Sequence, residues 1–600
     1  MTAPSPLRIL LLCHSFNSLS QRLMVALKAQ GHEVSVELDI SDTVTEEAVA
    51  LFKPDLLLAP FLKRRIPQSV WRRYLCLVLH PGPPGDQGPS ALDWALLDGA
   101  PRWGVTVLQA TADYDAGPVW ASAEFTMRDA PKGSIYRHEV ADAAEVAVLQ
   151  AVRQFMLTGT ETLSAPAPLA PARWRPLVRQ ADRAIDWTRH TTAQVLARLH
   201  SADGQPGVVD QLFDLPCRLW DGHAATGHSM QSFGAVPPGT LLAQRDGAVL
   251  RATVDGGVWI GQACLLDEAW AAGGTTDSSE ELTAPRFKLP TTMALPALCA
   301  ALPERAVALE RDRAEWSELH YTESGPPEAR VGSLSFDFYN GAMSSRQCKA
   351  LLAALREIRH KPLKVLLLLG GQDFFSNGIH LNCIEAAAYG LGEDGAGSAA
   401  DASWNNINAM NDVAHALITT TDRLTVAVLR GNAGAGGAFL ALAADKVWAH
   451  QGVLLNPHYK NMGNLYGSEY WTYLLPRRLG QQAAQHLMQQ RLPVSAPMAL
   501  KMGLIDRCLD GTVAAFEAQV QAQAQALAST YNLPERLLRK QEQRARDEAA
   551  RPLAAYRQEE LSRMHRNFYG FDPSYHVARY HFVHKLAHAW TPRHLALHRA

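Results

Sequence analysis

A histidine and a later acidic turn form the first group of residues whose types could carry out chemistry. His80 follows the apolar run Leu75–Leu79, and Asp115 lies in the segment Asp113–Pro118. Transfer of a carbonyl-containing group passes through a tetrahedral oxyanion, which requires hydrogen-bond donors and a side chain that moves protons. A histidine at a strand end and an aspartate on a neighbouring loop supply such groups. We therefore predict a group-transfer site around these two side chains.

Two glycine-rich segments form the second group. One contains Gly378-Ile379-His380, and the other contains Gly434-Ala435-Gly436-Gly437. They follow two apolar runs, Val365–Leu369 and Leu424–Leu429, that we interpret as strands. Glycine lets the backbone approach a ligand closely, and a helix N-terminus adds the positive end of its dipole. A single glycine-rich segment is often only a tight turn. The prediction of a binding site lined by backbone groups therefore depends on the presence of both segments.

The elements that position the first group alternate between strands and amphipathic helices over residues 7–157. This rhythm predicts an α/β domain with a mostly parallel sheet, whose functional loops follow the carboxyl ends of the strands. A stiff Pro/Ala linker, Ala165–Pro171, comes next. Residues 173–290 then show short strands with Gly turns, which predict a small β-rich domain, and Gly273–Ser279 reads as a mobile loop.

The second group lies in another α/β unit that we expect to begin after a helix over 292–317. Beyond residue 512 the pattern is helical and rich in charge up to about residue 565, which favours solvated helix faces. The predicted domains are residues 1–160, 173–290, a helical connector 291–327, 328–510 and a C-terminal helical region 511–600. The expected fold class is thus a multidomain α/β protein.

Composition excludes several classes of protein. The 600 residues have a net charge of −2, 47% hydrophobic residues and eight scattered cysteines without a Cys-x-x-Cys pair. We therefore expect no nucleic-acid partner, no membrane span and no metal site, and we expect a cytoplasmic protein. The short polar start is too short for a signal peptide.

Residues 7–126 resemble formyltransferases that use N10-formyl-tetrahydrofolate. The matching segments are Pro54–Leu58, Ile66-Pro67, Leu77–Pro83, Gly104–Val107 and Asp115–Pro118, with Ala184–Trp187 resembling the start of the family's C-terminal OB-like domain. The resemblance implies a Rossmann-type fold, with His80 and Asp115 as two members of the family's Asn–His–Asp set. The Asn is replaced by Val78, and Gln87 or Ser90 is a candidate substitute. The folate is expected between the 80–90 and 111–117 loops, which adds Asp113 to the binding residues.

Residues 330–510 resemble the crotonase (enoyl-CoA hydratase/isomerase) family, whose fold is a ββα spiral. The resemblance implies that the backbone N–H groups of Ile379 and Gly436 bind the carbonyl of an acyl-coenzyme A thioester. It also places Gly378, His380, Gly437 and His458 beside the coenzyme A.

The two glutamates of hydratases are missing from the crotonase-like segment. One falls at Phe439 and the other near Pro457–Tyr459, so water addition lacks its acid and base. Glu469, together with Tyr459 or His458, is the predicted working set.

The fusion of these two halves resembles the family of HoxX-type maturation proteins for [NiFe]-hydrogenases, with further similarity in Tyr556–Leu561 and Phe568–Pro573. The resemblance implies formyl transfer from N10-formyl-tetrahydrofolate to coenzyme A, then decarbonylation of formyl-CoA to carbon monoxide and free CoA. It implies the hydrogenase maturation machinery as partner, and we hypothesise an internal channel between the sites. A formyltransferase with another acceptor, such as an aminoacyl-tRNA, and a non-catalytic CoA-binding scaffold remain alternatives.

Overall fold

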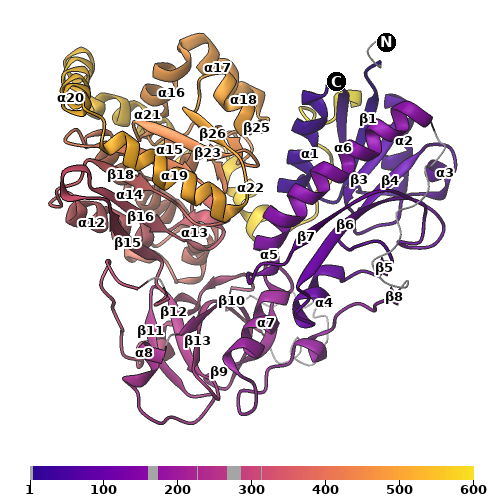
Figure 1. Ribbon diagram of the computed structural model, residues 1–600, viewed down its shortest axis with the longest axis horizontal. Helices are drawn as coiled ribbons and strands as arrows, with labels where there is room; N and C mark the ends of the chain where they lie inside the picture. The colour runs from indigo at the N-terminus through magenta and orange to yellow at the C-terminus, as the bar shows by residue number, and fades with distance from the viewer. Residues whose placement is uncertain (1–4, 160–172, 226, 267–284, 313, 600) are drawn as a thin grey trace. The chain divides into compact units, whose positions relative to one another are not determined.

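The computed structural model describes residues 5–159, 173–225, 227–266, 285–312 and 314–599 (Figure 1). The contacts divide the chain into two units. The first contains Met1–Asp186, Ala193–Asp210 and Ala587–Ala600, and the second contains Trp187–Thr192 and Gln211–Leu586. The linker Ala165–Pro171 and the predicted loop Gly273–Ser279 lie outside the described residues.

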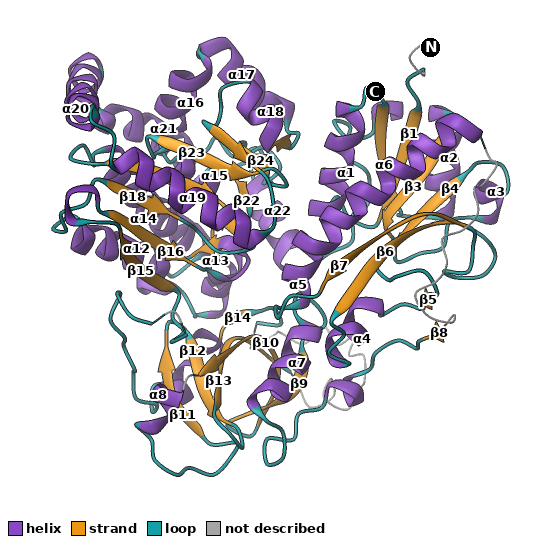
Figure 2. Ribbon diagram, in the orientation of Figure 1, coloured by secondary structure: helices purple, strands orange, loops and turns teal. Residues whose placement is uncertain are grey.

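The first unit is built on a six-stranded sheet with strand order β2-β1-β3-β4-β6-β7 (Figure 2). Its strands are β1 (Arg8–Cys13), β2 (Glu33–Leu38), β3 (Leu56–Phe61), β4 (Cys76–His80), β6 (Arg102–Gln109) and β7 (Val119–Thr126). The pairings among β2, β1, β3 and β4 are parallel, whereas β4–β6 and β6–β7 are antiparallel. The longer helices are α1 (Ser18–Ala29), α2 (Asp42–Phe52), α4 (Ala91–Leu97) and α6 (Ala141–Thr158). This confirms the expected mostly parallel α/β fold.

Local sequence explains why these elements form. Five consecutive residues of β1, Ile9 to Cys13, are buried, as expected for a central strand covered on both faces. Asn17 caps α1 by accepting a hydrogen bond from the Ser20 N–H.

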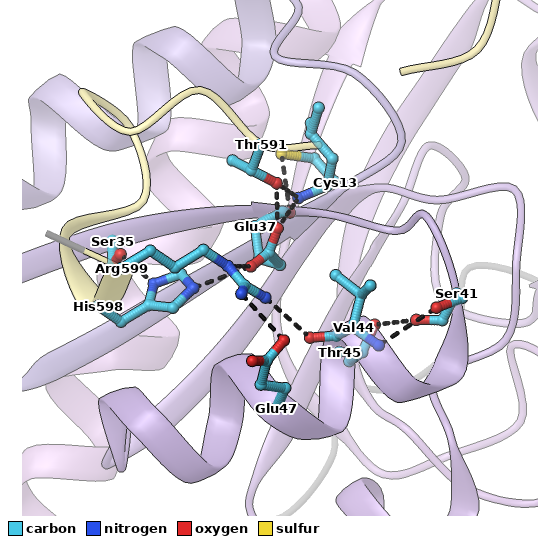
Figure 3. Close-up of polar contacts among 11 residues, drawn as sticks. Cys13, Ser35, Glu37, Ser41, Val44, Thr45, Glu47, Thr591, His598 and Arg599 are labelled. Atoms are coloured by element: carbon cyan, nitrogen blue, oxygen red, sulfur yellow. Dashed lines mark hydrogen bonds and ion pairs between the residues drawn. The ribbon is translucent and has the colours of Figure 1, made fainter. Parts of the chain in front are cut away.

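The C-terminal tail, residues 587–599, completes the first unit along strand β2 (Figure 3). The Val36 N–H donates to the Leu595 carbonyl at 3.0 Å. Glu37 is fully buried and accepts a hydrogen bond from Thr591, while His598 Nε2 and Arg599 Nε each lie 2.8 Å from its Oε2. The region that we expected to be helical to the C-terminus therefore ends with α22 (Ser574–Val583), and the last residues belong to the first unit.

The second unit begins with the small β-rich part. An antiparallel sheet has the order β11-β12-β13-β10, and β14 pairs with β13. The strands are β10 (Leu215–Ala225), β11 (Leu241–Arg245), β12 (Ala248–Ala252), β13 (Gly257–Leu265) and β14 (Leu289–Pro290); β9 (Val208–Leu212) spans the boundary between the units.

The helix expected over 292–317 is wrong. Among the described residues of that segment, the α-helical structure consists of two single turns, α10 (Thr291–Ala294) and α11 (Pro296–Cys299), and strand β15 (Leu319–Ser324) follows. Pro296 and Pro303 lack the N–H that a continuous helix requires and clash with the preceding turn, so the apolar periodicity is not realised.

The crotonase-like part contains two sheets that the chain visits alternately. The main sheet has the order β15-β16-β18-β21-β23-β26, and the smaller has β19-β22-β24-β25. The remaining main strands are β16 (Val331–Phe336), β18 (Val365–Leu368), β21 (Leu424–Leu429), β23 (Lys446–His450) and β26 (Arg507–Leu509). The smaller sheet contains β19 (Phe374–Ser376), β22 (Asn432–Gly434), β24 (Leu454–Asn456) and β25 (Val494–Ser495), and a further pair joins β17 (Ala342–Met343) to β20 (Gly378–Ile379).

Three strands of the main sheet each continue into one strand of the smaller sheet: β18 into β19, β21 into β22 and β23 into β24. The helices of this part are α12 (Ser345–Ile358), α13 (Leu381–Ala386), α14 (Ala399–Ile418), α15 (Gly436–Leu442), α16 (Trp471–Leu479), α17 (Gln481–Gln490) and α18 (Ala496–Lys501). This strand–strand–helix repeat confirms the expected ββα spiral.

Three long helices follow: α19 (Val513–Ala528), α20 (Leu533–Ala550) and α21 (Leu553–Tyr569). Helix α20 buries only Leu533, in agreement with the predicted solvated face. Helix α21 differs, because Met564 and Phe568 belong to the core of the crotonase-like part and Glu560 is fully buried.

Candidate functional site

His80 is the last residue of β4, and its side chain is 4% exposed. Its Nδ1 lies 3.5 Å from Oδ1 of Asp115, the predicted partner. Its Nε2 lies 3.0 Å from Oδ2 of Asp86, which sequence reasoning did not identify. Asp115 adopts a left-handed backbone conformation (φ +51°), and its Oδ2 accepts a hydrogen bond from the Gly88 N–H at 3.2 Å. The structure thus brings the predicted pair together and adds a second carboxylate.

Glycine is required beside this imidazole. A Cβ at Gly82 would lie 2.5 Å from both His80 Nε2 and Asp86 Oδ2. Arg175 directly follows strand β8 (Arg173–Trp174), and its Nε lies 3.6 Å from Asp86 Oδ1 and its Nη1 2.7 Å from Asp98 Oδ2. The histidine is therefore enclosed by charged groups that fix the orientation of its ring.

The other predicted residues of the first site are distributed along the surrounding loops. Gln87 lies in β5 (Asp86–Gln87), adjacent to Asp86, and Ser90 is buried, with its Oγ accepting a hydrogen bond from the Val178 N–H at 3.2 Å. Asp113 is exposed in the turn before Asp115. Val78, the expected replacement of the family's Asn, lies on the same face of β4 as His80, because side chains alternate along a strand.

The two glycine-rich segments of the second site lie against each other. A Cβ at Gly378 (φ +84°) would lie 3.2 Å from the Gly436 nitrogen. Ile379 is the second residue of β20, and Gly436 is the first residue of α15. The two backbone segments predicted to bind a thioester carbonyl are therefore adjacent.

Glu469 is positioned directly over Gly436. A Cβ at Gly436 would lie 2.7 Å from the Glu469 Oε1, so only glycine fits beneath this carboxyl. Glu469 is 1% exposed, and its Oε2 accepts a hydrogen bond from the Tyr459 hydroxyl at 2.5 Å. Burial raises the pKa of Glu469 to about 7, and burial together with the neighbouring carboxylate raises the pKa of Tyr459 well above its usual value. A carboxyl of this kind can exchange a proton at neutral pH.

Apolar and capping contacts complete the surroundings of Glu469. Phe439, the residue expected in place of one hydratase glutamate, stacks on Tyr459, with ring centroids 5.2 Å apart. His380 caps α13 by accepting the Cys383 N–H, and burial lowers its pKa to about 4, so it is neutral. His458 is buried beside Tyr459, and Gly437 is buried in the first turn of α15.

Comparisons with known proteins agree with this architecture. A family model for enoyl-CoA hydratase/isomerase matches residues 339–593, and one for the formyl transferase C-terminal domain matches residues 177–268. A hydrogenase maturation factor HoxX from Bradyrhizobium diazoefficiens is 52% identical over 597 residues, which cover 99% of this chain and 97% of the relative. The chain belongs to the HoxX family of hydrogenase maturation factors.

Other relatives support the division into halves. A crystal structure of HypX from Aquifex aeolicus in complex with tetrahydrofolic acid matches with a TM-score of 0.90 and 41% identity, covering 99% of both chains. A methionyl-tRNA formyltransferase from Roseiflexus castenholzii is 31% identical over 28% of this chain and 52% of its own length. The HoxX-family chain thus combines a formyltransferase part with a crotonase part.

Sequence reasoning missed two charged residues around His80 in this HoxX-family protein: Asp86 and Arg175. Asp86 lies in the same glycine-rich stretch as His80, so its charge next to the predicted motif was the available signal. Arg175 reaches this site only through tertiary contacts, and no local pattern marks it. Among the described residues no cluster of metal-ligating side chains occurs, and no described helix is long and apolar enough to cross a membrane.

Proposed function

We propose that this protein makes carbon monoxide for the active-site iron of a [NiFe]-hydrogenase in two steps. The first step transfers a formyl group from N10-formyl-tetrahydrofolate to coenzyme A. The second step decarbonylates formyl-CoA to carbon monoxide and free CoA. The tetrahydrofolic acid complex of the HypX relative and the family membership support the choice of substrate and pathway.

His80 is the proposed acid–base of the first step. It accepts the thiol proton of coenzyme A as the sulfur attacks the formyl carbon, and it returns that proton to the folate nitrogen as the C–N bond breaks. Asp115 holds the ring from the Nδ1 side. Gln87, Ser90 and Asp113 are the proposed contacts to the folate.

The backbone N–H groups of Ile379 and Gly436 are the proposed donors to the formyl carbonyl in the second step, with Gly378, Gly437, His380 and His458 lining the coenzyme A. Glu469 then removes the formyl proton, and the electron pair of the C–H bond becomes the lone pair on carbon of the leaving carbon monoxide. The electron pair of the C–S bond departs with sulfur. Glu469 delivers the proton to the thiolate, and Tyr459 supports the carboxylate through its hydroxyl.

The observation that carries the proposal is the position of Glu469 over Gly436. In this position, a carboxyl whose pKa is about 7 lies against the backbone that we propose binds the carbonyl. The stacked Phe439 and Tyr459 make the same region apolar, which favours decarbonylation over attack by water.

The test is incubation of the purified protein with N10-formyl-tetrahydrofolate, with and without coenzyme A, and trapping of carbon monoxide by deoxyhaemoglobin. We expect a CoA-dependent carbonyl-haem spectrum that is lost in His80→Ala and in Glu469→Gln. If formyl-CoA accumulates and no carbon monoxide is released, the protein carries out only the first step. If the folate is turned over only when an aminoacyl-tRNA is present, the protein is a formyltransferase with that acceptor. If both substrates bind but neither is turned over, the protein is a non-catalytic CoA-binding scaffold.

A further inference from the structure

Glu560 is a buried carboxyl that the proposed chemistry does not use. It lies on α21, in the C-terminal helices, and its side chain has no solvent exposure. Its Oε2 accepts a hydrogen bond from the Tyr470 N–H at 2.9 Å. Its Oε1 accepts from the Thr472 N–H at 2.9 Å and from the Thr472 hydroxyl at 2.5 Å. All three donors belong to one short segment, which directly follows Glu469.

This segment has an unusual backbone conformation. Glu469 and Tyr470 have φ angles of +58° and +60°, although neither is glycine. A non-glycine residue in the left-handed region costs about 1 kcal/mol or more and persists only where neighbouring groups hold it. Two consecutive residues of this kind immediately before α16 therefore require anchors.

The anchors come from two other helices. Asn411 of α14 accepts the Glu469 N–H at 2.9 Å and is hydrogen-bonded to Ser468. At the start of α16, the N–H groups of Tyr470 and Thr472 have no partner within the helix, and Glu560 of α21 accepts both. The N-cap residue, Tyr470, provides no side-chain cap of its own. The carboxyl of Glu560 thus replaces the local cap and fixes the turn from the C-terminal side.

The turn determines where the Glu469 side chain points. Because both sides of Glu469 are tied, its carboxyl is held over Gly436 and against Tyr459. We propose that Glu560 is a positioning residue of the decarbonylation site, acting through the Glu469–Tyr470 turn rather than by contact with substrate. This inference deepens the proposed function and rests on it.

The nature of the donors supports a specific role. The hydrogen bonds that Glu560 accepts come from neutral groups, and burial raises its pKa to about 8. At neutral pH the carboxyl is therefore mostly protonated and uncharged, and its two oxygens accept three hydrogen bonds from one turn. What this contact supplies is the geometry of that turn.

The test supplies formyl-CoA directly and measures carbon monoxide by deoxyhaemoglobin trapping, so that the first step is not involved. Glu560→Gln keeps the size of the side chain but replaces one acceptor oxygen by a donor that faces N–H groups. We expect kcat to fall at least about ten-fold with KM within about two-fold, because a catalytic group displaced by about 1 Å loses rate without loss of substrate binding. Glu559→Gln is the matched control, since Glu559 is partly exposed and pairs with Arg551. It should behave as the unsubstituted protein.

Two further readouts separate positioning from general support of the fold. The midpoint of the pH–rate profile should move to lower pH in Glu560→Gln, because a less fixed Glu469 is better solvated. Thr472→Val keeps Glu560 and removes only the hydroxyl donor. It should lower kcat by a smaller factor than Glu560→Gln does. This variant also tests the inference if Glu560→Gln does not fold. Unchanged kcat and midpoint in these variants would overturn the inference alone. Absence of carbon monoxide from the unsubstituted protein would instead reject the proposed function.

Discussion

Asp86 Oδ2 lies 3.0 Å from the Nε2 of His80, the ring nitrogen opposite to the one that faces Asp115. Both nitrogens of the imidazole therefore have a carboxylate neighbour, and both carboxylates lie on loops of the first unit. Because the two carboxylates restrict rotation of the ring about its χ angles, the orientation of the His80 imidazole is set before a substrate binds.

Asp86→Asn should therefore impair the first step. Loss of the carboxylate that holds Nε2 should lower folate turnover by about ten-fold or more. Consumption of N10-formyl-tetrahydrofolate, followed by absorbance, measures this. Asp98→Asn is the control, because Asp98 contacts the same Arg175 but is 47% exposed and is not within ion-pair distance of His80. Equal losses in the two variants would show that Arg175, not the histidine contact, is responsible.

Carbon monoxide release from formyl-CoA should increase as the pH rises through about 7. Burial raises the pKa of Glu469 to about 7, so the carboxyl is protonated below this value and becomes a base above it. Initial rates between about pH 5.5 and 8.5 give the profile. Tyr459→Phe removes the hydroxyl that donates to Glu469, and its midpoint should move to higher pH, since a hydrogen bond to the charged form favours that form. A flat profile would exclude Glu469 as the base.

Glu469→Gln should stabilise the protein at neutral pH while abolishing carbon monoxide release. The pKa of Glu469 is raised from 4.5 to about 7 on folding, so its contribution to stability decreases as the pH rises between these values. One pKa unit corresponds to about 1.4 kcal/mol, which sets the gain at up to about 3 kcal/mol above pH 7. Urea unfolding at pH 5 and pH 8 measures it, and the gain should be larger at pH 8. A loss of stability at both pH values would contradict this.

Gly436→Ala should abolish turnover of acyl-CoA substrates. The added Cβ would lie 2.7 Å from the Glu469 carboxyl, so either the carboxyl or α15 must shift. Decarbonylation of formyl-CoA and calorimetric binding of coenzyme A measure the effect. Gly397→Ala is the control, because a Cβ there meets nothing within 4 Å and the residue is exposed. Normal activity of Gly436→Ala would show that the carbonyl is bound elsewhere.

His598→Ala should destabilise the first unit by about 1–3 kcal/mol, because Glu37 stays buried with one partner fewer. Hydrogen bonds from His598, Thr591 and Arg599 lower the pKa of Glu37, so the stabilisation is complete above the ordinary pKa of glutamate and is lost as the pH falls through the lowered value. Chemical denaturation at pH 7 and at acidic pH measures it, and the difference from the unsubstituted protein should shrink in acid. Glu47→Gln, which removes an exposed partner of Arg599, should have little effect.

The sequence predicted the elements better than their ends and caps. Strands such as β4 and β21 are continuous apolar runs. His80 lies at the end of one such run, and Ile379 and Gly436 lie in the glycine-rich segments that follow two others, which is why the motifs could be placed. The prediction of a helix over 292–317 was wrong because it relied on the apolar spacing and did not take Pro296 and Pro303 into account.

Contacts between distant segments could not be predicted. Glu560 was part of a charge-rich helical pattern, and only the packing of α21 beside α14 and α16 shows that this one charge faces inward. Glu37 likewise looked like an ordinary polar residue in a strand, because its partners lie more than 550 positions later in the chain. Tertiary burial, which local pattern does not encode, decides the role of both carboxyls.

The tail on β2 has a consequence for synthesis of the protein. Domains near an N-terminus usually fold while the rest of the chain is still being translated. Here the first unit lacks the partners of Glu37 until residues 591–599 have been synthesised, so its final packing requires segments more than 550 positions apart in the chain. A chain truncated before residue 587 keeps every residue proposed for formyl transfer, but it lacks the tail that pairs with β2 and the three hydrogen-bond partners of Glu37. We expect such a truncated chain to have a less stable first unit, so that the part proposed for formyl transfer is fully stable only together with the complete crotonase-like half.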